Sequence, residues 1–158
     1  MAALALLSAA TIAGCGGSDE GGGEEAEFPG GADPAKARVI DEWSSALRGG
    51  DVEAAAEFFE IPSVAQNGTP PLPLASREAV IAFNRALPCG AELIEAEAEG
   101  RYTIATFELT ERPGAGKCGS GTGETARTAF VIEDGLIREW RRVPEEVVPG
   151  PSSDSPVV

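Results

Sequence analysis

The spacing of apolar residues changes once along this chain, and the change limits the folds available to it. Up to Leu87, apolar residues recur mainly at helical intervals of three or four positions. From Ala91 to Val143 they mostly alternate with polar residues, as they do in strands with one buried face. The two regions meet at Pro88-Cys89-Gly90, which ends a helix. A helical block followed by a strand block predicts an α+β domain with an antiparallel sheet.

Three helices are expected before this junction, and each has a recognisable start. Asp33-Pro34 combines an N-cap residue with a proline at the first helical position, and Gly49-Gly50 ends that helix. Asp51 caps a short second helix, and Ser76 caps a third. The Pro-rich stretch between these two helices, 61–75, has room for one or two short strands.

Four strands are expected after the junction, at 91–99, 101–111, 124–133 and 136–143. The last two are joined by Asp134-Gly135, a strong signal for a two-residue hairpin turn. The domain is therefore expected to be three N-terminal helices packed on an antiparallel sheet.

The turn at Asp134-Gly135 also predicts which residues face each other, if pairing continues without interruption. Phe130 then lies opposite Glu139, and Thr128 lies opposite Arg141. Paired residues share a face of the sheet, and this face is apolar near the turn and polar further along. We expect it to form the wall of a pocket whose polar groups are Thr128, Glu139 and Arg141. The alternative is a cross-strand ion pair on a solvated face.

The order of these elements resembles the nuclear transport factor 2-like superfamily, which includes SnoaL-like polyketide cyclases and ketosteroid isomerases. The resemblance covers about 34–144. It implies a cone formed by a curved sheet and the helices, with a pocket open at one end. The superfamily hosts isomerases, dehydratases, hydrolases and binding modules, so the fold alone does not give a function. The residues that carry the resemblance are Trp43, Ala46-Leu47, Gly50-Asp51, Ala55, Phe58-Phe59, Ser76-Arg77-Glu78, Phe83 and Asp134-Gly135-Leu136-Ile137.

Two enzyme types within this resemblance can be compared with the sequence. Ketosteroid isomerases use a carboxylate base and a tyrosine donor, and the chain has one tyrosine, Tyr102. With Glu108 or Glu139 nearby, it could polarise a carbonyl group. Limonene epoxide hydrolase-like members resemble Trp140-Arg141, but Val143 stands where their acid is expected, which argues against epoxide hydrolysis.

A structural role for Tyr102 is the alternative. On an ideal strand, the opposite face is more apolar and is the better candidate for the buried side; it carries Thr103, Ala105, Phe107 and Leu109. The residues expected around a ligand are Trp43, Tyr102, Thr128, Glu139 and Arg141.

Composition excludes several other functions. The chain has 12 Lys and Arg against 26 Asp and Glu, a net charge of −14, so we expect no nucleic-acid partner, because phosphate contacts need a basic surface. It has no histidine, which excludes Ser-His and Cys-His nucleophile pairs and His-ligated metals. The stretch 114–119 matches G-x-G-x-x-G, but a strand and no helix follows, so no dinucleotide cofactor is expected. No metal site is expected either.

The N-terminus has the pattern of an export signal followed by an anchor. Residues 1–14 are expected to be a signal peptide, because their apolar run is too short to span a bilayer. The run ends in Ile12-Ala13-Gly14-Cys15, which resembles the lipobox of bacterial lipoproteins and implies lipidation at Cys15. We expect 15–33 to be the lipidated cysteine and a flexible acidic tether, and 145–158 to be a disordered tail.

The two remaining cysteines form an even pair. Because disulfides persist in exported proteins, Cys89 and Cys118 are expected to be bonded. Both lie beside glycine, which is typical of loops. The alternative is two free, buried thiols.

These observations predict a lipoprotein anchored at the extracytoplasmic face of the cell membrane. Its domain is expected to bind a small molecule, apolar or carbonyl-containing, or a partner, without catalysis. The alternative is a ketosteroid isomerase- or cyclase-like enzyme that acts by carboxylate proton transfer. Superfamily members often dimerise through the sheet, so an exposed Trp140 or Val131 would favour a homodimer.

Overall fold

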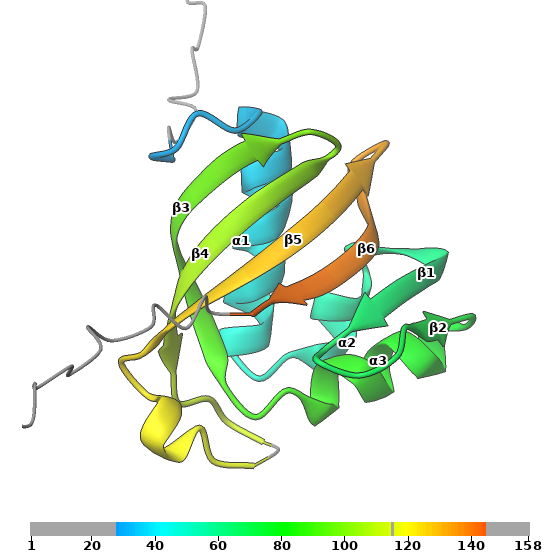
Figure 1. Cartoon of the computed structure of the whole chain (residues 1–158). Helices are drawn as coiled ribbons and strands as arrows, with labels where there is room; N and C mark the ends of the chain where they lie inside the picture. Colours follow the sequence, from blue (N-terminus) through cyan, green and yellow to red (C-terminus); the bar gives the residue numbers. More distant parts are fainter. Residues whose placement is uncertain (1–27, 115, 145–158) are drawn as a thin grey trace, which may run out of the picture.

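The computed structural model describes residues 28–114 and 116–144 (Figure 1). It confirms the α+β class, with three helices and a six-stranded sheet. The predicted signal peptide, Cys15 and the tail 145–158 lie outside the described residues. The elements are α1 (Pro34–Arg48), α2 (Val52–Ala56), β1 (Phe59–Gln66), β2 (Leu72–Leu74), α3 (Arg77–Ala86), β3 (Gly90–Glu99), β4 (Tyr102–Thr110), a short 3-10 turn (Gly119–Gly121), β5 (Thr125–Glu133) and β6 (Leu136–Val143).

The predicted helix starts are confirmed by their capping hydrogen bonds. The Asp33 carboxylate accepts from the backbone N–H of Ala35, and Asp51 accepts from Ala54, both at 2.9 Å. The Ser76 hydroxyl caps α3 in the same way. The second helix is short, as expected: it ends at Ala56, and Phe59 is already the first residue of β1.

The strands are arranged in the order β2-β1-β6-β5-β4-β3. All neighbouring pairs are antiparallel except β1 and β6, which are parallel. The strands β1 and β2 are those expected in the Pro-rich stretch. The sheet curves in front of α1, which packs against β3 and β4 (Figure 1). We call the face toward α1 the inner face and the opposite face the outer face.

The domain begins earlier than the sequence suggested. The backbone N–H of Ala32 donates to Ala96 of β3 at 3.1 Å, and the Ala96 N–H donates to the carbonyl of Pro29 at 2.8 Å. Phe28 is half-buried against the core. The expectation of a free tether up to residue 33 is therefore wrong for 28–32. These residues satisfy the exposed backbone groups at the edge of β3.

The predicted register of the last hairpin is correct only next to the turn. Asp134-Gly135 adopts positive φ angles of 50° and 77°, as a type I′ turn requires. Ile132 pairs with Ile137 as expected, but Val131 then pairs with Glu139. One extra residue, Arg138, is thus accommodated on β6 as a β-bulge.

Beyond the bulge, each residue of β6 lies on the face opposite to the one predicted. Trp140 lies opposite Phe130, and Arg142 lies opposite Thr128. Arg141 lies on the outer face instead. The physical reason is the burial of Trp140, which is 5% exposed; an unbroken register would bury the Glu139 side chain in its place, at a large desolvation cost.

Aromatic rings fill the space between the helices and the inner face. Trp43 of α1 contacts Phe59, Phe107 and Phe130 edge-on, with ring centroids 5.6–6.3 Å apart. Its indole N–H donates to the Asn84 Oδ1 of α3 at 2.9 Å. This hydrogen bond joins two helices and holds the indole ring in one orientation over the sheet.

A buried arginine fixes the ends of the helices beside the sheet. Arg112 is 7% exposed, and its guanidinium donates to the carbonyls of Asn84 (3.0 Å), Arg85 (3.2 Å) and Leu87 (3.0 Å from Nε). It also reaches the carbonyl of Leu47, at 3.5 Å. These carbonyls are the groups that the last turns of α3 and α1 leave without intrahelical donors. Burial lowers the pKa of Arg112.

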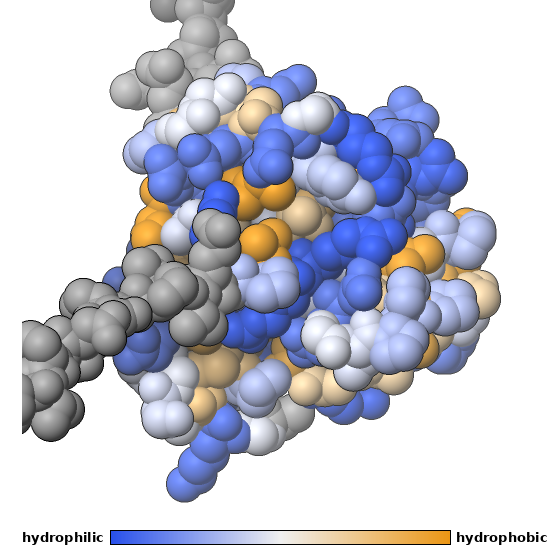
Figure 2. All heavy atoms as spheres, viewed as in Figure 1, coloured by the Kyte–Doolittle hydropathy of each residue, from blue (hydrophilic) through white to orange (hydrophobic). Residues whose placement is uncertain are grey.

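The outer face of the sheet is predominantly hydrophilic. Figure 2 shows a band of hydrophilic side chains across it, with a few apolar side chains between them. Val131 and Trp140 are 4% and 5% exposed, so the exposure that would favour a homodimer is not present. In the part of the chain from Phe28 to Pro144 that the structure describes, no helix is long and apolar enough to cross a membrane.

Candidate ligand-binding pocket

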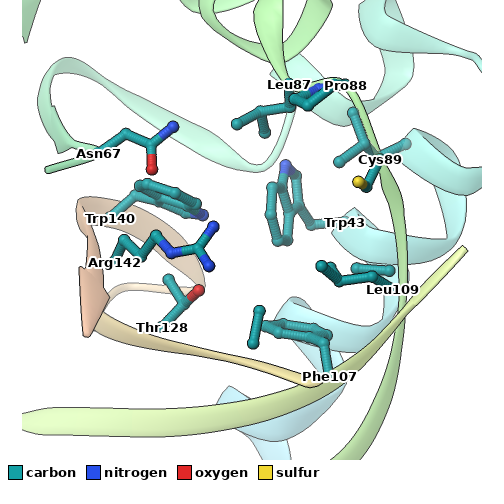
Figure 3. A pocket seen from close by; sticks show the side chains of 13 residues that line it. Trp43, Asn67, Leu87, Pro88, Cys89, Phe107, Leu109, Thr128, Trp140 and Arg142 are labelled. Atoms are coloured by element: carbon teal, nitrogen blue, oxygen red, sulfur yellow. The ribbon is translucent and has the colours of Figure 1, made fainter. Parts of the chain in front are cut away.

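A cavity of about 90 Å³ lies between α1 and the inner face of the sheet (Figure 3). Side chains from α1, the α3–β3 junction and strands β3 to β6 surround it, and it is open to solvent on one side. Its lining is Trp43, Leu47, Asn67, Leu87, Pro88, Cys89, Ala91, Phe107, Leu109, Ala126, Thr128, Trp140 and Arg142.

Most of this lining is apolar. Trp43 and Phe107 are buried, at 2% exposure each, and provide aromatic surface from α1 and β4. Leu87 and Leu109 lie around them (Figure 3). Such a lining binds the apolar part of a small molecule and leaves orientation to a few polar groups.

Three side chains from β5 and β6 provide the polar groups at one end. Thr128 and Arg142 lie opposite each other on β5 and β6. Trp140 lies two residues before Arg142, on the same face of β6. The indole nitrogen of Trp140 is buried and has no hydrogen-bond partner among the described residues. In Figure 3, this nitrogen and the Arg142 guanidinium both point toward Trp43 across the cavity.

The charged group of this set, Arg142, is not neutralised by the protein that surrounds it. It forms no ion pair or hydrogen bond with any residue of 28–114 or 116–144. The described lining also contains no Asp, Glu or Tyr. The polar groups of the lining are therefore mainly donors: an indole N–H, a guanidinium, the Thr128 hydroxyl and the Asn67 amide, of which the hydroxyl and the amide can also accept.

The predicted disulfide is confirmed and forms part of the wall. Cys89 and Cys118 are joined with an S–S distance of 2.02 Å and a Cα–Cα distance of 4.5 Å, which fits disulfide geometry. Cys89 lines the cavity. The bond ties the segment before β3 to the β4–β5 loop, so it fixes one side of the cavity opening.

Tyr102, expected to line the pocket, lies on the outer face instead. Its hydroxyl accepts from Arg101 at 2.8 Å, and the Arg101 guanidinium lies 4.7 Å from the ring centroid. Tyr102 and Arg141 line a wider depression on the outer face, which Arg142 also borders. The tyrosine is thus on the side of the sheet away from the aromatic cavity.

Glu139 also belongs to the outer face. Its carboxylate pairs with Arg101 at 2.9 Å and with the Arg141 Nε at 2.7 Å. Burial alone would raise the pKa of Glu139, but the hydrogen bonds from Arg141 and Arg101 outweigh it and lower the pKa below its usual value. Tyr102, Glu139 and the two arginines therefore form an ion-pair network on the outer face.

Of the five residues expected around a ligand, Trp43 and Thr128 line the cavity. Tyr102, Glu139 and Arg141 do not. Trp140 and Arg142 line the cavity but were not among the predicted residues. The size of the Trp140 side chain is the sequence feature that could have predicted its burial. A large aromatic side chain on a strand gains more from burial than the neighbouring carboxylate. Among the described residues, no cluster of three His, Cys, Asp or Glu side chains could hold a metal ion.

Comparisons with known proteins show similarity in structure but not in sequence. No protein-family model and no curated protein sequence matches the chain. Many solved structures are similar. One is a proposed polyketide cyclase from Sinorhizobium meliloti, with a TM-score of 0.52 and 19% identity over 67% of this chain and 94% of that chain.

Two further structures agree with it. A proposed ketosteroid isomerase from Kribbella flavida has a TM-score of 0.52 and 15% identity, and covers 78% of this chain and 90% of its own. A nuclear transport factor 2-like protein of unknown function from Cytophaga hutchinsonii has a TM-score of 0.52 and 13% identity, and the match covers 68% of this chain and 88% of that chain. The chain therefore has the nuclear transport factor 2-like, SnoaL-like fold.

Proposed function

We propose that this protein is an extracytoplasmic lipoprotein whose domain binds a small, largely apolar molecule without transforming it. The observation that carries the proposal is the chemistry of the cavity lining: aromatic and aliphatic surface at one end and hydrogen-bond donors at the other. Proton transfer at this site would need a base, and the described lining offers no carboxylate.

The volume of the cavity limits the ligand. About 90 Å³ is well below the ~300 Å³ at which drug-sized ligands are usually accommodated. A small molecule fits, with its apolar part against Trp43 and Phe107.

The second candidate is an enzyme of the cyclase or isomerase type, favoured by the descriptions of two similar structures. Its expected residues do not support it, because Tyr102 and Glu139 meet on the outer face and the Arg101 side chain lies between them. Conversion of a β,γ-unsaturated ketone to its conjugated isomer, followed by absorbance, tests this candidate. Turnover that is lost in Tyr102→Phe would favour the enzyme over the binding module.

The proposed anchor rests on Ile12-Ala13-Gly14-Cys15 and on the disulfide, which is typical of proteins outside the cytoplasm. Two or more acyl chains on one cysteine hold a protein stably at a membrane. Expression of the full chain in a bacterium, followed by mass determination of the mature N-terminus, tests it. We expect acylated Cys15 in the membrane fraction and no acylation in Cys15→Ser; an unmodified Cys15 would contradict the anchor.

Native mass spectrometry of the purified full chain tests the binding proposal. We expect a bound mass that disappears on denaturation, or one that appears after incubation with small apolar molecules. A protein that takes up none of them, whatever their polar group, would contradict a ligand-binding function.

A further inference from the structure

We infer that the ligand is a short aliphatic monocarboxylate whose carboxylate is held by Arg142 and the Trp140 indole N–H. This inference rests on the proposed function and names the class of ligand. Its apolar chain would lie against Trp43 and Phe107, and its head group would lie at the β5–β6 end of the cavity.

The unpaired indole N–H of Trp140 is the first observation that points to an acceptor. A buried donor without a partner is costly because its desolvation is not compensated, and folded proteins rarely leave one. The Trp43 indole, which lines the same cavity, does have a protein partner in Asn84. An oxygen of a bound ligand would satisfy Trp140 in the same way.

The guanidinium of Arg142 is the second observation: it is exposed to solvent, lines the cavity and is therefore available to attract an anion. The arginines that lie on the outer face of the sheet have acidic partners, as the pairs Arg127–Glu97 and Arg138–Glu60 illustrate. Among the described residues, none provides such a partner for Arg142. A guanidinium and a neighbouring N–H form a donor pair that suits a carboxylate.

The side chains around this donor pair favour a ligand with a single negative charge over a cationic ligand. Thr128, opposite Arg142, can donate a third hydrogen bond. No described acidic side chain in the lining repels an anion or competes for the guanidinium. An amine would meet only the like charge of Arg142, so cationic ligands are excluded on electrostatic grounds.

The size of the cavity favours a short chain. A dry apolar cavity of ~150 Å³ accommodates benzene in another protein, and the cavity here is about 90 Å³. An aliphatic chain of a few carbons therefore fits with less rearrangement than an aromatic ring.

Tryptophan fluorescence of the full chain provides a direct readout, because both of its tryptophans line the cavity. The probes are butanoate and its neutral, nearly isosteric amide, butanamide. We expect saturable fluorescence change with butanoate and affinity for butanamide that is lower by about tenfold or more, the usual effect of losing a charge-assisted hydrogen bond. Butanoate affinity should also fall with added salt.

Two arginine variants show on which face of the sheet butanoate binds. Arg142→Gln should weaken butanoate binding by about 10- to 100-fold and leave butanamide unchanged. The matched control is Arg141→Gln, which removes the adjacent guanidinium on the outer face and should leave both affinities unchanged. Trp140→Phe keeps an aromatic ring but removes the N–H, and calorimetry should show weaker butanoate binding.

The outcomes of these experiments distinguish a failure of the carboxylate inference from a failure of the proposed binding function. Equal affinities for butanoate and butanamide, or no effect of Arg142→Gln, would overturn the carboxylate inference and leave the binding function intact. If butanoate, butanamide and butanol all fail to bind, the proposed function fails with it. Circular dichroism of each variant establishes that a lost affinity is not a lost fold.

Discussion

Arg141 and Arg142 are neighbours in the chain, yet only Arg142 lines the cavity on the inner face of the sheet. Arg141 donates to Glu139 and Gln66 on the outer face, whereas Arg142 lines the cavity opposite Thr128. Successive side chains of a strand alternate in this way. Of these two arginines, only Arg142 is therefore available to a ligand in the cavity.

The two tryptophans should respond differently to the same substitution. Trp43→Phe removes the donor to Asn84 Oδ1 and leaves that buried oxygen without its partner. Trp140→Phe removes a donor that has no partner among the described residues. The loss of ring volume is the same in both variants. Urea denaturation should therefore show Trp43→Phe to be less stable than Trp140→Phe by about 1–3 kcal/mol. Equal losses would mean that the Trp43–Asn84 hydrogen bond does not stabilise the fold.

Arg112 should matter to stability although it forms no ion pair with a described residue. Arg112→Met retains most of the apolar stem but leaves the carbonyls of Asn84, Arg85 and Leu87 without their donor. We expect a loss of about 3 kcal/mol in the free energy of unfolding. The control is Arg127→Met, which breaks an exposed ion pair with Glu97 and should cost about 0–1 kcal/mol. A small loss in both variants would show that water replaces Arg112 at these carbonyls.

The disulfide should stabilise the domain against unfolding. Its two cysteines are 29 positions apart, and a bridge over such a loop contributes about 3.5 kcal/mol in the chain-entropy model. The double variant Cys89→Ala/Cys118→Ala should unfold at lower urea concentration, with no further change on addition of reductant. Free-thiol labelling of the denatured, unreduced domain should find neither Cys89 nor Cys118 reactive. Labelling of both would disprove the bond in solution.

The pKa of Glu139 predicts an acid-dependent loss of stability. Because this pKa is lower in the folded protein than the unfolded value of about 4.3, the carboxylate contributes its full stabilisation above that pH. The contribution is lost as the pH falls through the folded pKa. Glu139→Gln should therefore be less stable than the natural chain at pH 7, with a difference that shrinks below about pH 4. Glu124→Gln, on an exposed side chain, provides the control. A pH-independent difference would contradict a charge-based role.

Gly30 should be required for the docking of the N-terminal segment on β3. It has a φ of +105°, and an added Cβ would lie 2.3 Å from the Ala96 carbonyl oxygen. Gly31 also has positive φ, but a Cβ there would meet nothing within 4 Å. Gly30→Ala should therefore accelerate hydrogen exchange of the Ala96 amide much more than Gly31→Ala does. Unchanged protection in both variants would mean that Pro29 does not hold this amide in solution.

The features set by local chemistry could be predicted from the sequence. Helix starts at Asp33, Asp51 and Ser76 depend on a side chain within three residues of the backbone group that it caps. The turn at Asp134-Gly135 depends on two residues that tolerate positive φ. These signals do not depend on the rest of the fold. Together with the change in apolar spacing at Pro88-Cys89-Gly90, they allow the fold class to be predicted.

The pocket could not be predicted as well, because its lining depends on pairing across strands. A β-bulge at Ile94 of β3 and another at Arg138 of β6 each change the face of every residue that follows. Neither bulge has a glycine or a turn residue to mark it. The burial of Trp140 selects the second one, and that selection involves Phe83 and Phe130, which lie far away in the sequence.

The bulge at Arg138 decides which side chains of β6 lie inside the domain. With the extra residue accommodated on β6, an indole and a guanidinium line the cavity. In an unbroken hairpin, the same strand would place the Glu139 carboxylate opposite Phe130 and the Arg141 guanidinium opposite Thr128, which is an ion pair on the inner face. The pairing of a single backbone residue therefore determines the charge of the interior without any change in the side chains themselves.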